Sequence, residues 1–230
     1  DTAWNDAQRP EHKLPDLLPA PVSSAAIDAA ARLLSNGRKT ALLLRAASLH
    51  GAGLEAAGRV QAKTGARLLC DTFAPHAELG AGRVPVERIP YFAEQIVDFL
   101  KDFEQIIFVG AKPPVSFFAY PGKPSWCVPE GSHLSYLAHA HQDGAQALAA
   151  LADSLGAPAR SPVRIPLQLP ELPNGPLTAL GVAQVIAAMT PDNVIFADES
   201  ATASFALLTT MARARPHTHL PLTGGSIGQG

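Results

Sequence analysis

The residues best suited to chemistry lie in two short polar segments late in the sequence. Asp198-Glu-Ser-Ala-Thr202 follows an apolar run that predicts a strand and precedes a pattern that predicts a helix. Free backbone N–H groups at such a junction, together with the Ser200 and Thr202 hydroxyls, can bind an anion such as a diphosphate. Further along, Gly224-Gly-Ser-Ile-Gly228 lets the backbone approach a flat ring closely, because glycine has no Cβ. The two segments together predict a site for a ligand with an anionic end and a planar ring.

Two of these assignments have simpler alternatives. Glu199 has the chemistry of a general base, but at a strand-helix junction it can equally be a helix N-terminal acid that interacts favourably with the macrodipole. The glycines from Gly224 to Gly230 would also suit an ordinary flexible loop. The segment 198–202 upstream favours the reading in which the loop faces a ligand.

Histidines are the other residues that invite a functional interpretation. Four of the eight are candidates for a metal site: His133, His139, His141 and His217. No cluster of carboxylates or cysteines completes such a site, so we expect no metal ligand in this sequence and surface or core roles for these histidines. His76 lies just past a predicted strand, at the carboxyl edge where α/β sheets bind ligands, and could have a substrate or interdomain role.

Two further segments resemble known binding signatures only weakly. Gly51-Ala-Gly53 follows a predicted strand and opens a helix, but the third glycine of a dinucleotide fingerprint would be Ala56. Two interpretations of this region therefore remain: it binds a nucleotide, or it is a purely structural domain. The segment Lys112–Lys123 carries Phe117, Phe118 and Tyr120. Two lysines are too few for nucleic acid, so we expect this segment to pack against a linker or a neighbouring subunit.

Composition excludes several classes of partner. The 230 residues carry a formal net charge of −2 and no block of Lys or Arg, so nucleic acid is not expected. The longest apolar stretches are strand-sized and too short to cross a bilayer, and no signal peptide is visible. Only two cysteines are present, without CxxC spacing, which favours a reduced, cytoplasmic setting. Cys70, in an apolar run, is expected to be a core thiol and not a catalytic one.

The elements that must position these residues follow an α/β pattern. Short apolar runs typical of strands covered on both faces alternate with helical patterns. The predicted strands are 40–45, 66–70, 105–109 and 133–137, with a short one at 126–128. The predicted helices start after Ser23 and span 53–64, 91–102 and 143–155. This alternation predicts a Rossmann-like parallel sheet.

Composition also suggests domain boundaries. We expect residues 1–22 to be a connector, 23–156 a central Rossmann-like domain, 157–176 a Pro-rich linker and 177–230 the beginning of a second α/β domain. The second part should contain helix 177–189, strand 193–197, helix 200–214 and a strand near 219–222. Two strands cannot enclose a core, so the sequence is expected to be cut in mid-domain, and the absent initiator Met suggests that residue 1 is not the native start.

The order and spacing of Pro191–Thr202 and Thr223–Gly230 resemble the start of the diphosphate-binding domain of thiamine-diphosphate-dependent enzymes. The group it resembles contains acetolactate synthase and benzoylformate decarboxylase, and residues 110–126 resemble most the proteins labelled acetolactate synthase large subunit-like. By the same resemblance, residues 23–156 would be the family's middle domain, with Asp1–Trp4 leaving a pyrimidine-binding domain upstream.

The resemblance implies a cofactor site as well as a fold. Thiamine diphosphate and Mg²⁺ would be the cofactors, and FAD or ADP is possible in the central domain. The implied cofactor-binding residues are Glu199, Ser200, Ala201, Thr202, Gly224, Gly225, Ser226 and Ile227. The backbone at Gly225 would face the aminopyrimidine, and Ile227 would hold the cofactor bent. Ala201 departs from relatives that often carry a hydroxyl, so contacts there would come from its backbone.

The implied activity is that of a longer parent enzyme, a lyase or transferase acting on 2-keto acids by decarboxylation or carboligation. The family's catalytic glutamate and its Gly-Asp-Gly…Asn magnesium motif would lie outside these residues, so the fragment alone should be inactive. A homodimer or homotetramer is implied for the full protein. Two alternatives stay open: a non-catalytic nucleotide-binding or structural Rossmann-like domain, and a degenerate homologue of the family.

Overall fold

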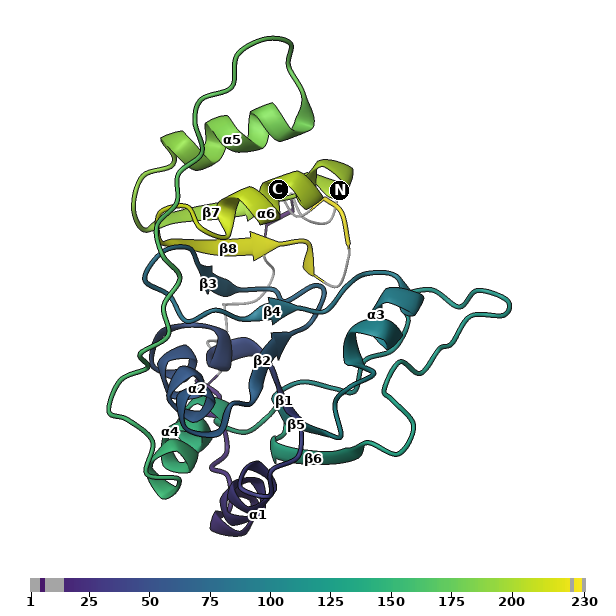
Figure 1. The fold of residues 1–230 in the computed structure, drawn as a ribbon, viewed down its shortest axis with the longest axis vertical. Helices are drawn as coiled ribbons and strands as arrows, with labels where there is room; N and C mark the ends of the chain where they lie inside the picture. The colour runs from purple at the N-terminus through teal and green to yellow at the C-terminus, as the bar shows by residue number, and fades with distance from the viewer. Residues whose placement is uncertain (1–4, 7–14, 224–225, 229–230) are drawn as a thin grey trace.

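The larger of two sheets is a five-stranded parallel sheet. The computed structural model describes residues 5–6, 15–223 and 226–228, without the side chain of Ser204. The strand order is β4-β2-β1-β5-β6, and each neighbouring pair is parallel (Figure 1). The strands are β1 (Thr40–Leu44), β2 (Arg67–Cys70), β4 (Glu87–Arg88), β5 (Gln105–Val109) and β6 (His133–Ala138). The predicted α/β fold with a parallel sheet is confirmed.

Helices cover both faces of this sheet. They are α1 (Ser24–Leu34), α2 (Gly51–Thr64), α3 (Ala93–Leu100) and α4 (Gly144–Ser154), with a 3-10 turn, η2 (Ala46–Leu49), after β1. Alternate strand residues point to opposite faces. Leu42 and Leu44 pack in one core with residues of α1, α2 and α4, whereas Ala41 and Leu43 pack in another with residues of α3. All four strand residues are almost fully buried, which explains the continuous apolar run.

The second sheet joins distant parts of the chain. It has the order β3-β8-β7, where β3 is Ala77–Leu79, β7 is Val194–Asp198 and β8 is His217–Pro221. β7 and β8 are parallel, and β3 runs antiparallel to β8. Because β3 belongs to the loop after β2, the two halves of the sequence share a backbone hydrogen-bond ladder.

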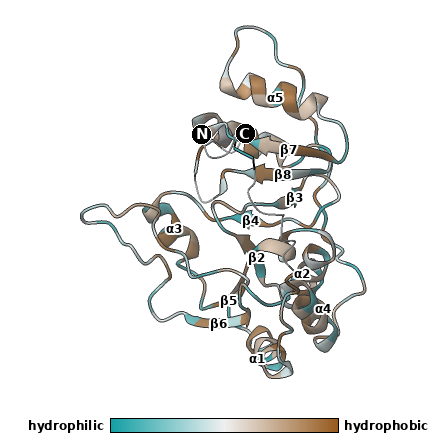
Figure 2. Ribbon diagram, turned by 180° about the vertical axis from the view of Figure 1, so that it is seen from behind, coloured by the Kyte–Doolittle hydropathy of each residue, from teal (hydrophilic) through white to brown (hydrophobic). Residues whose placement is uncertain are grey.

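Two helices lie against this sheet and against each other. α5 (Ala179–Met189) and α6 (Ser204–Met211) share a small core with Phe196 of β7, and a 3-10 turn, η3 (Ala201–Ala203), precedes α6. Hydrophobic residues run along α5 and β7 (Figure 2). Leu180, Met189 and Ile195 remain 54%, 69% and 68% exposed, so part of this apolar surface has no cover within the described residues. No helix in the described ranges is long and apolar enough to span a membrane.

Residues 157–176 contain no helix or strand, and Figure 1 shows this segment running from α4 to α5 along the edge of the molecule. It is held at several points. The backbone N–H of Ser161 donates to Glu55 at 2.8 Å, and Arg164 forms an ion pair with the same carboxylate at 2.6 Å. The N–H of Ile165 donates to the Arg83 carbonyl at 3.0 Å. The segment is therefore docked on α2 and on the loop between β3 and β4.

Several element boundaries differ from the predictions. Residues 126–128 form no strand; Trp126 makes only an isolated bridge with Val115. The third helix starts at Ala93, after Pro90, and ends at Leu100, so it is shorter than the predicted 91–102. β3 and β4 were not predicted, because they are two or three residues long and show no apolar run. The predicted helix at 200 begins instead as η3, for a reason found in the candidate site.

Candidate functional site

The turn after β7 is built around a buried carboxylate, Asp198, which is only 5% exposed. Its Oδ1 accepts hydrogen bonds from the Ser200 N–H, at 2.8 Å, and from the Ser200 hydroxyl. Its Oδ2 lies 3.3 Å from Nε2 of His219, a residue of β8 that is 4% exposed. Burial alone would raise the pKa of Asp198, but the hydrogen bonds from His219 and Ser200 outweigh it and lower this pKa to about 2. The carboxylate is therefore ionised at physiological pH.

This network shapes the segment that the sequence analysis assigned to a diphosphate. Both donors of Ser200 are directed at Asp198, and Ala201 adopts a left-handed backbone conformation with φ 48°. A left-handed residue cannot continue an α-helix, so the chain first makes η3 and α6 starts only at Ser204. The Thr202 side chain is exposed. Ser200 is thus engaged within the turn, whereas Thr202 lies at the surface.

The structure brings the described end of the second predicted segment, residues 226–228, next to the first. The Glu199 carboxylate accepts a hydrogen bond from the N–H of Gly228, and this bond links the two predicted segments. Ile227 is 74% exposed. Gly224 and Gly225 lie outside the described residues. Glu199 thus has the role of a loop anchor here.

A cavity of about 350 Å³ opens beside this turn. Asp198, Ala201, Thr202 and Phe205 line one side, together with Pro221 and Leu222 after β8. The other side comes from the first half of the chain: Phe73, Arg88, Tyr91, Phe92, Phe117 and Phe118. The predicted residues Ala201 and Thr202 therefore belong to a cavity between the two sheets.

Arg88, Phe73 and Phe205 were not identified as site residues from the sequence. Position offered a signal only for Phe73, which follows a predicted strand at the carboxyl edge where ligands bind; Arg88 ends β4, which was not predicted. Arg88 lies with its guanidinium 6.0 Å from the Phe73 ring. Burial lowers the pKa of Arg88, and the nearby Cys70 and Asp198 act in the opposite direction.

The histidines and Cys70 lie outside this cavity lining. His76 stacks on His50 with ring centroids 4.3 Å apart, and burial followed by the proximity of His76 lowers the pKa of His50. Within the described ranges no three His, Cys, Asp or Glu side chains gather as metal ligands would. Cys70 is a core thiol, as predicted; burial, with a smaller contribution from Asp71, raises its pKa to about 12.

The Gly51-Ala-Gly53 segment has a packing explanation. η2 separates β1 from α2, so the strand does not lead directly into a glycine turn as in a dinucleotide site. A Cβ at Gly53 would overlap the Ala47 carbonyl oxygen and lie 3.0 Å from the Ala145 Cβ. Gly53 is thus required by the close approach of α2 to η2 and α4.

The Gly53→Ala substitution is expected to lower the free energy of unfolding by about 1–3 kcal/mol, because a backbone atom must move to admit the new methyl group. Urea denaturation followed by circular dichroism measures this. Lys63→Ala, at an exposed position of the same helix, is the control and should change stability little. Equal stabilities of the two variants would contradict the packing explanation.

The fold and the cavity together define an α/β protein with a polar turn and a cavity at the carboxyl ends of its strands. In sequence, the chain is 40% identical over 232 aligned positions to IlvX of Mycobacterium tuberculosis (strain ATCC 25618 / H37Rv), which is provisionally described as an acetolactate synthase large subunit. The match covers 100% of this chain and 44% of that relative. No protein-family model matches the chain.

Solved structures share the fold. The thiamine-diphosphate-dependent 4-hydroxybenzoylformate decarboxylase of Rhodococcus jostii RHA1 superposes with a TM-score of 0.65 at 18% identity, covering 93% of this chain and 42% of that one. Benzoylformate decarboxylase of Polynucleobacter necessarius gives 0.59 at 15% identity, covering 94% and 44%. The chain thus spans less than half the length of the relatives it matches. The sequence match confirms the resemblance to acetolactate synthase large subunit-like proteins, and the structural likenesses show a fold shared with benzoylformate decarboxylases.

Proposed function

We propose that the chain forms part of a longer enzyme that uses thiamine diphosphate and Mg²⁺ to act on 2-keto acids, by decarboxylation or carboligation. The observation that carries this proposal is the sequence identity of 40% along the whole chain, which includes the turn at 198–202. The share of 44% of that relative supports a longer parent protein. Residues 23–156 and 177–230 would then belong to its middle and diphosphate-binding domains, joined by 157–176.

The described residues fit the diphosphate end of such a cofactor. Asp198 holds Ser200 and thereby the turn, while the exposed Thr202 lines the cavity. Glu199 tethers the loop that carries Ile227, which is free to pack under a bent cofactor. Thiamine diphosphate, when bound, supplies the carbanion chemistry, and the protein supplies orientation and electrostatics. Ser226, Gly224 and Gly225 complete the proposed set.

The remaining parts of the proposal concern the whole enzyme. The catalytic glutamate and the Mg²⁺ ligands would lie in other segments of it, and the site would form between subunits of a homodimer or homotetramer. Both cysteines are buried free thiols, which supports a reducing, cytoplasmic setting. No nucleic-acid partner is proposed, in keeping with the net charge of −2.

Calorimetric titration of thiamine diphosphate with Mg²⁺ into the full protein tests the proposal. Saturable binding is expected, and Thr202→Ala should weaken it about tenfold, because it removes a hydrogen bond to a charged group. Thr209→Ala is the matched control, since Thr209 is exposed on α6 and its hydroxyl donates to the Phe205 carbonyl at 2.9 Å. Absence of binding to the full protein would overturn the assignment.

A nucleotide-binding role is the second candidate, because a larger cavity of about 490 Å³ lies at the carboxyl ends of β1, β2 and β5. Arg45 and Asp71, which form an ion pair, are among its lining residues. Open α/β sheets bind ligands in the crevice outside the carboxyl ends of such strands. Titration of FAD and ADP would distinguish this role: tight nucleotide binding without thiamine diphosphate binding would favour it.

A further inference from the structure

One cation faces the 198–202 turn from the other half of the chain. Arg88 is the last residue of β4 in the first sheet, and its half-buried side chain lines the same largely aromatic cavity as Ala201 and Thr202. Among the described residues that line this cavity it is the single cationic side chain, and it forms no ion pair of 4 Å or less within the described chain. Charged side chains that are partly removed from water usually have an oppositely charged partner. Arg88 therefore has a charge that a ligand in the cavity can pair.

The described groups around Arg88 leave its charge without a direct partner. The Phe73 ring lies 6.0 Å from the guanidinium carbon, at the outer limit of cation–π contact. Asp198 lines the same cavity and attracts the guanidinium, but its oxygens accept hydrogen bonds from Ser200 and His219. Burial lowers the pKa of Arg88, yet a guanidinium stays charged in proteins. Its N–H groups are therefore available to an oxyanion, which they can bind with two parallel hydrogen bonds.

We propose that Arg88 binds the anionic end of the ligand in this cavity, where it pairs with a phosphate or diphosphate group that also contacts Thr202. The inference rests on the proposed function for the identity of that group as the cofactor diphosphate, whereas the choice of an oxyanion rests on the cavity alone. A tetrahedral phosphate group presents oxygens in several directions, so it can accept hydrogen bonds from both walls at once. A planar carboxylate that is held by a guanidinium has both oxygens turned toward it. In this arrangement the parallel sheet supplies a charge to the site as well as its support.

Calorimetric titrations into the full protein, with Mg²⁺ present throughout, test this role of Arg88. The probes are thiamine diphosphate, inorganic diphosphate, thiamine and acetate. Inorganic diphosphate is the anionic group alone, thiamine lacks it, and acetate replaces it by a carboxylate. We expect saturable binding of the two diphosphate probes, and binding of thiamine and acetate that is at least about tenfold weaker, because both lack the phosphate contacts. Acetate binding as tight as that of inorganic diphosphate would overturn the phosphate class, and thiamine binding as tight as that of thiamine diphosphate would overturn the role of the anionic end.

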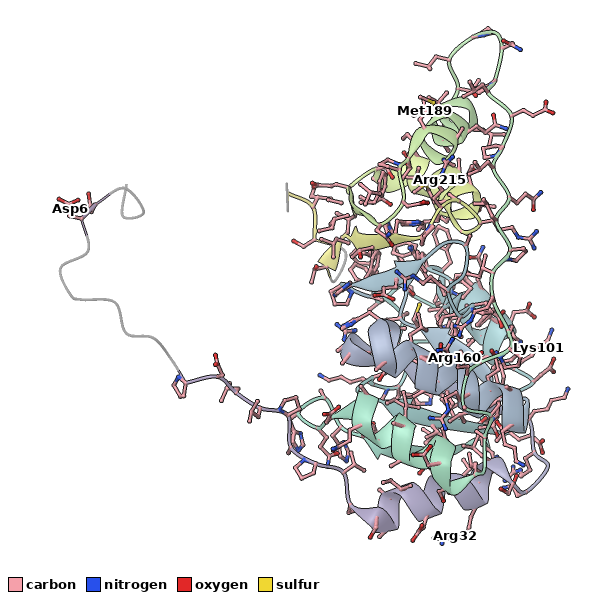
Figure 3. The ribbon with its side chains drawn as sticks, turned by 90° about the vertical axis from the view of Figure 1, so that its left-hand side faces the viewer. Asp6, Arg32, Lys101, Arg160, Met189 and Arg215 are labelled. Atoms are coloured by element: carbon pink, nitrogen blue, oxygen red, sulfur yellow. The ribbon has the colours of Figure 1, made fainter. Side chains whose placement is uncertain are left out.

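Variants of Arg88 locate the anion. Arg88→Met keeps an apolar stem without the charge, so it should weaken both diphosphate probes at least about tenfold, as the loss of a hydrogen bond between charged groups does, and leave thiamine binding unchanged. Arg88→Lys keeps the charge without the bidentate geometry and should recover part of the affinity. Arg32→Met is the matched control, because Arg32 is exposed on α1 at the far end of the molecule from α6 (Figure 3). A thermal melt of each variant checks folding, and the calorimetric stoichiometry reports the folded fraction separately from the dissociation constant.

An unchanged affinity of Arg88→Met for both diphosphate probes would overturn the inference. If the variant loses affinity for inorganic diphosphate alone, the cavity takes a free oxyanion, and the assignment of Arg88 to the cofactor fails. The cofactor proposal is tested separately: if wild type and Arg88→Met bind thiamine diphosphate equally well, the proposed function stands and only the role of Arg88 fails. If inorganic diphosphate binds through Arg88 and thiamine diphosphate does not bind, the oxyanion site stands and the proposed enzyme class fails.

Discussion

Replacing Asp198 with alanine is expected to lower the free energy of unfolding at neutral pH by about 3 kcal/mol, because removing one partner of a buried charged network leaves the other groups unpaired. His219 would lose the carboxylate 3.3 Å from its Nε2, and both donors of Ser200 would lose their acceptor. The turn at 198–202 depends on these bonds. Thiamine diphosphate affinity of the full protein should therefore fall together with stability.

Urea denaturation measures the stability change. Asp192→Ala is the control, because Asp192 is exposed and its ion pair with Arg215 is long, at 3.8 Å. Surface pairs of this kind contribute about 0–1 kcal/mol. If Asp198→Ala cost no more than Asp192→Ala, the buried network would have no role in holding the turn.

The contribution of Asp198 should also depend on pH. Its pKa is lowered from 3.8 to about 2 by the folded structure, so its stabilising effect is fully present above about pH 4 and is lost as the pH falls through about 2. That difference in pKa corresponds to a contribution of about 2 kcal/mol to the free energy of unfolding. The stability advantage of the wild type over Asp198→Asn, compared at pH 7, 4 and 2.5, should be constant between the first two and shrink at the third. An advantage that is constant down to pH 2.5 would contradict this pKa.

Replacing Gly80 with alanine is expected to cost about 2–5 kcal/mol of unfolding free energy. Gly80 follows β3, at the seam between the two halves of the chain, and has φ 91°. A Cβ there would overlap the Arg215 carbonyl oxygen and lie 2.9 Å from that of Ala214. The neighbouring N–H of Ala81 donates to the same Ala214 oxygen at 2.8 Å, so the backbones cannot separate without breaking the seam.

Gly82→Ala provides a matched control for this prediction. Gly82 also has a left-handed φ, of 76°, but a Cβ at this position would meet no atom within 4 Å. Its substitution should cost only the backbone strain, about 1–2 kcal/mol. Thermal and urea denaturation of the two variants would separate strain from steric overlap. If both variants lost a similar amount of unfolding free energy, the backbone at Gly80 would be able to move away from the Arg215 and Ala214 carbonyl groups without further cost.

Much of the fold was predictable because each buried strand carries its own signal. Runs such as Thr40–Leu44 and Gln105–Val109 are apolar at every position, since helices cover both faces of the sheet. Ser23 at the start of α1 was predictable for the same local reason: its side chain accepts a hydrogen bond from the Ala26 N–H. Local chemistry determines such features without reference to the rest of the chain.

The candidate site was predictable only in part. The turn at 198–202 is a local pattern of small polar residues between a strand and a helix, and it could be read directly. The residues that line the cavity opposite this turn could not be identified in the same way. Arg88 and Phe73 occupy a short strand and a loop with no distinctive pattern, and they reach the turn only because β3 pairs with β8.

The sequence by itself therefore determined the α/β class, the parallel strands and the polar turn, since these depend on residues close together in the chain. The tertiary structure alone decided the strand order, the pairing of β3 with β8, and the meeting of Asp198 with His219 and of Arg88 with the aromatic cavity. Those contacts join residues far apart in sequence. Their energies depend on burial and geometry that exist only after the two sheets have come together.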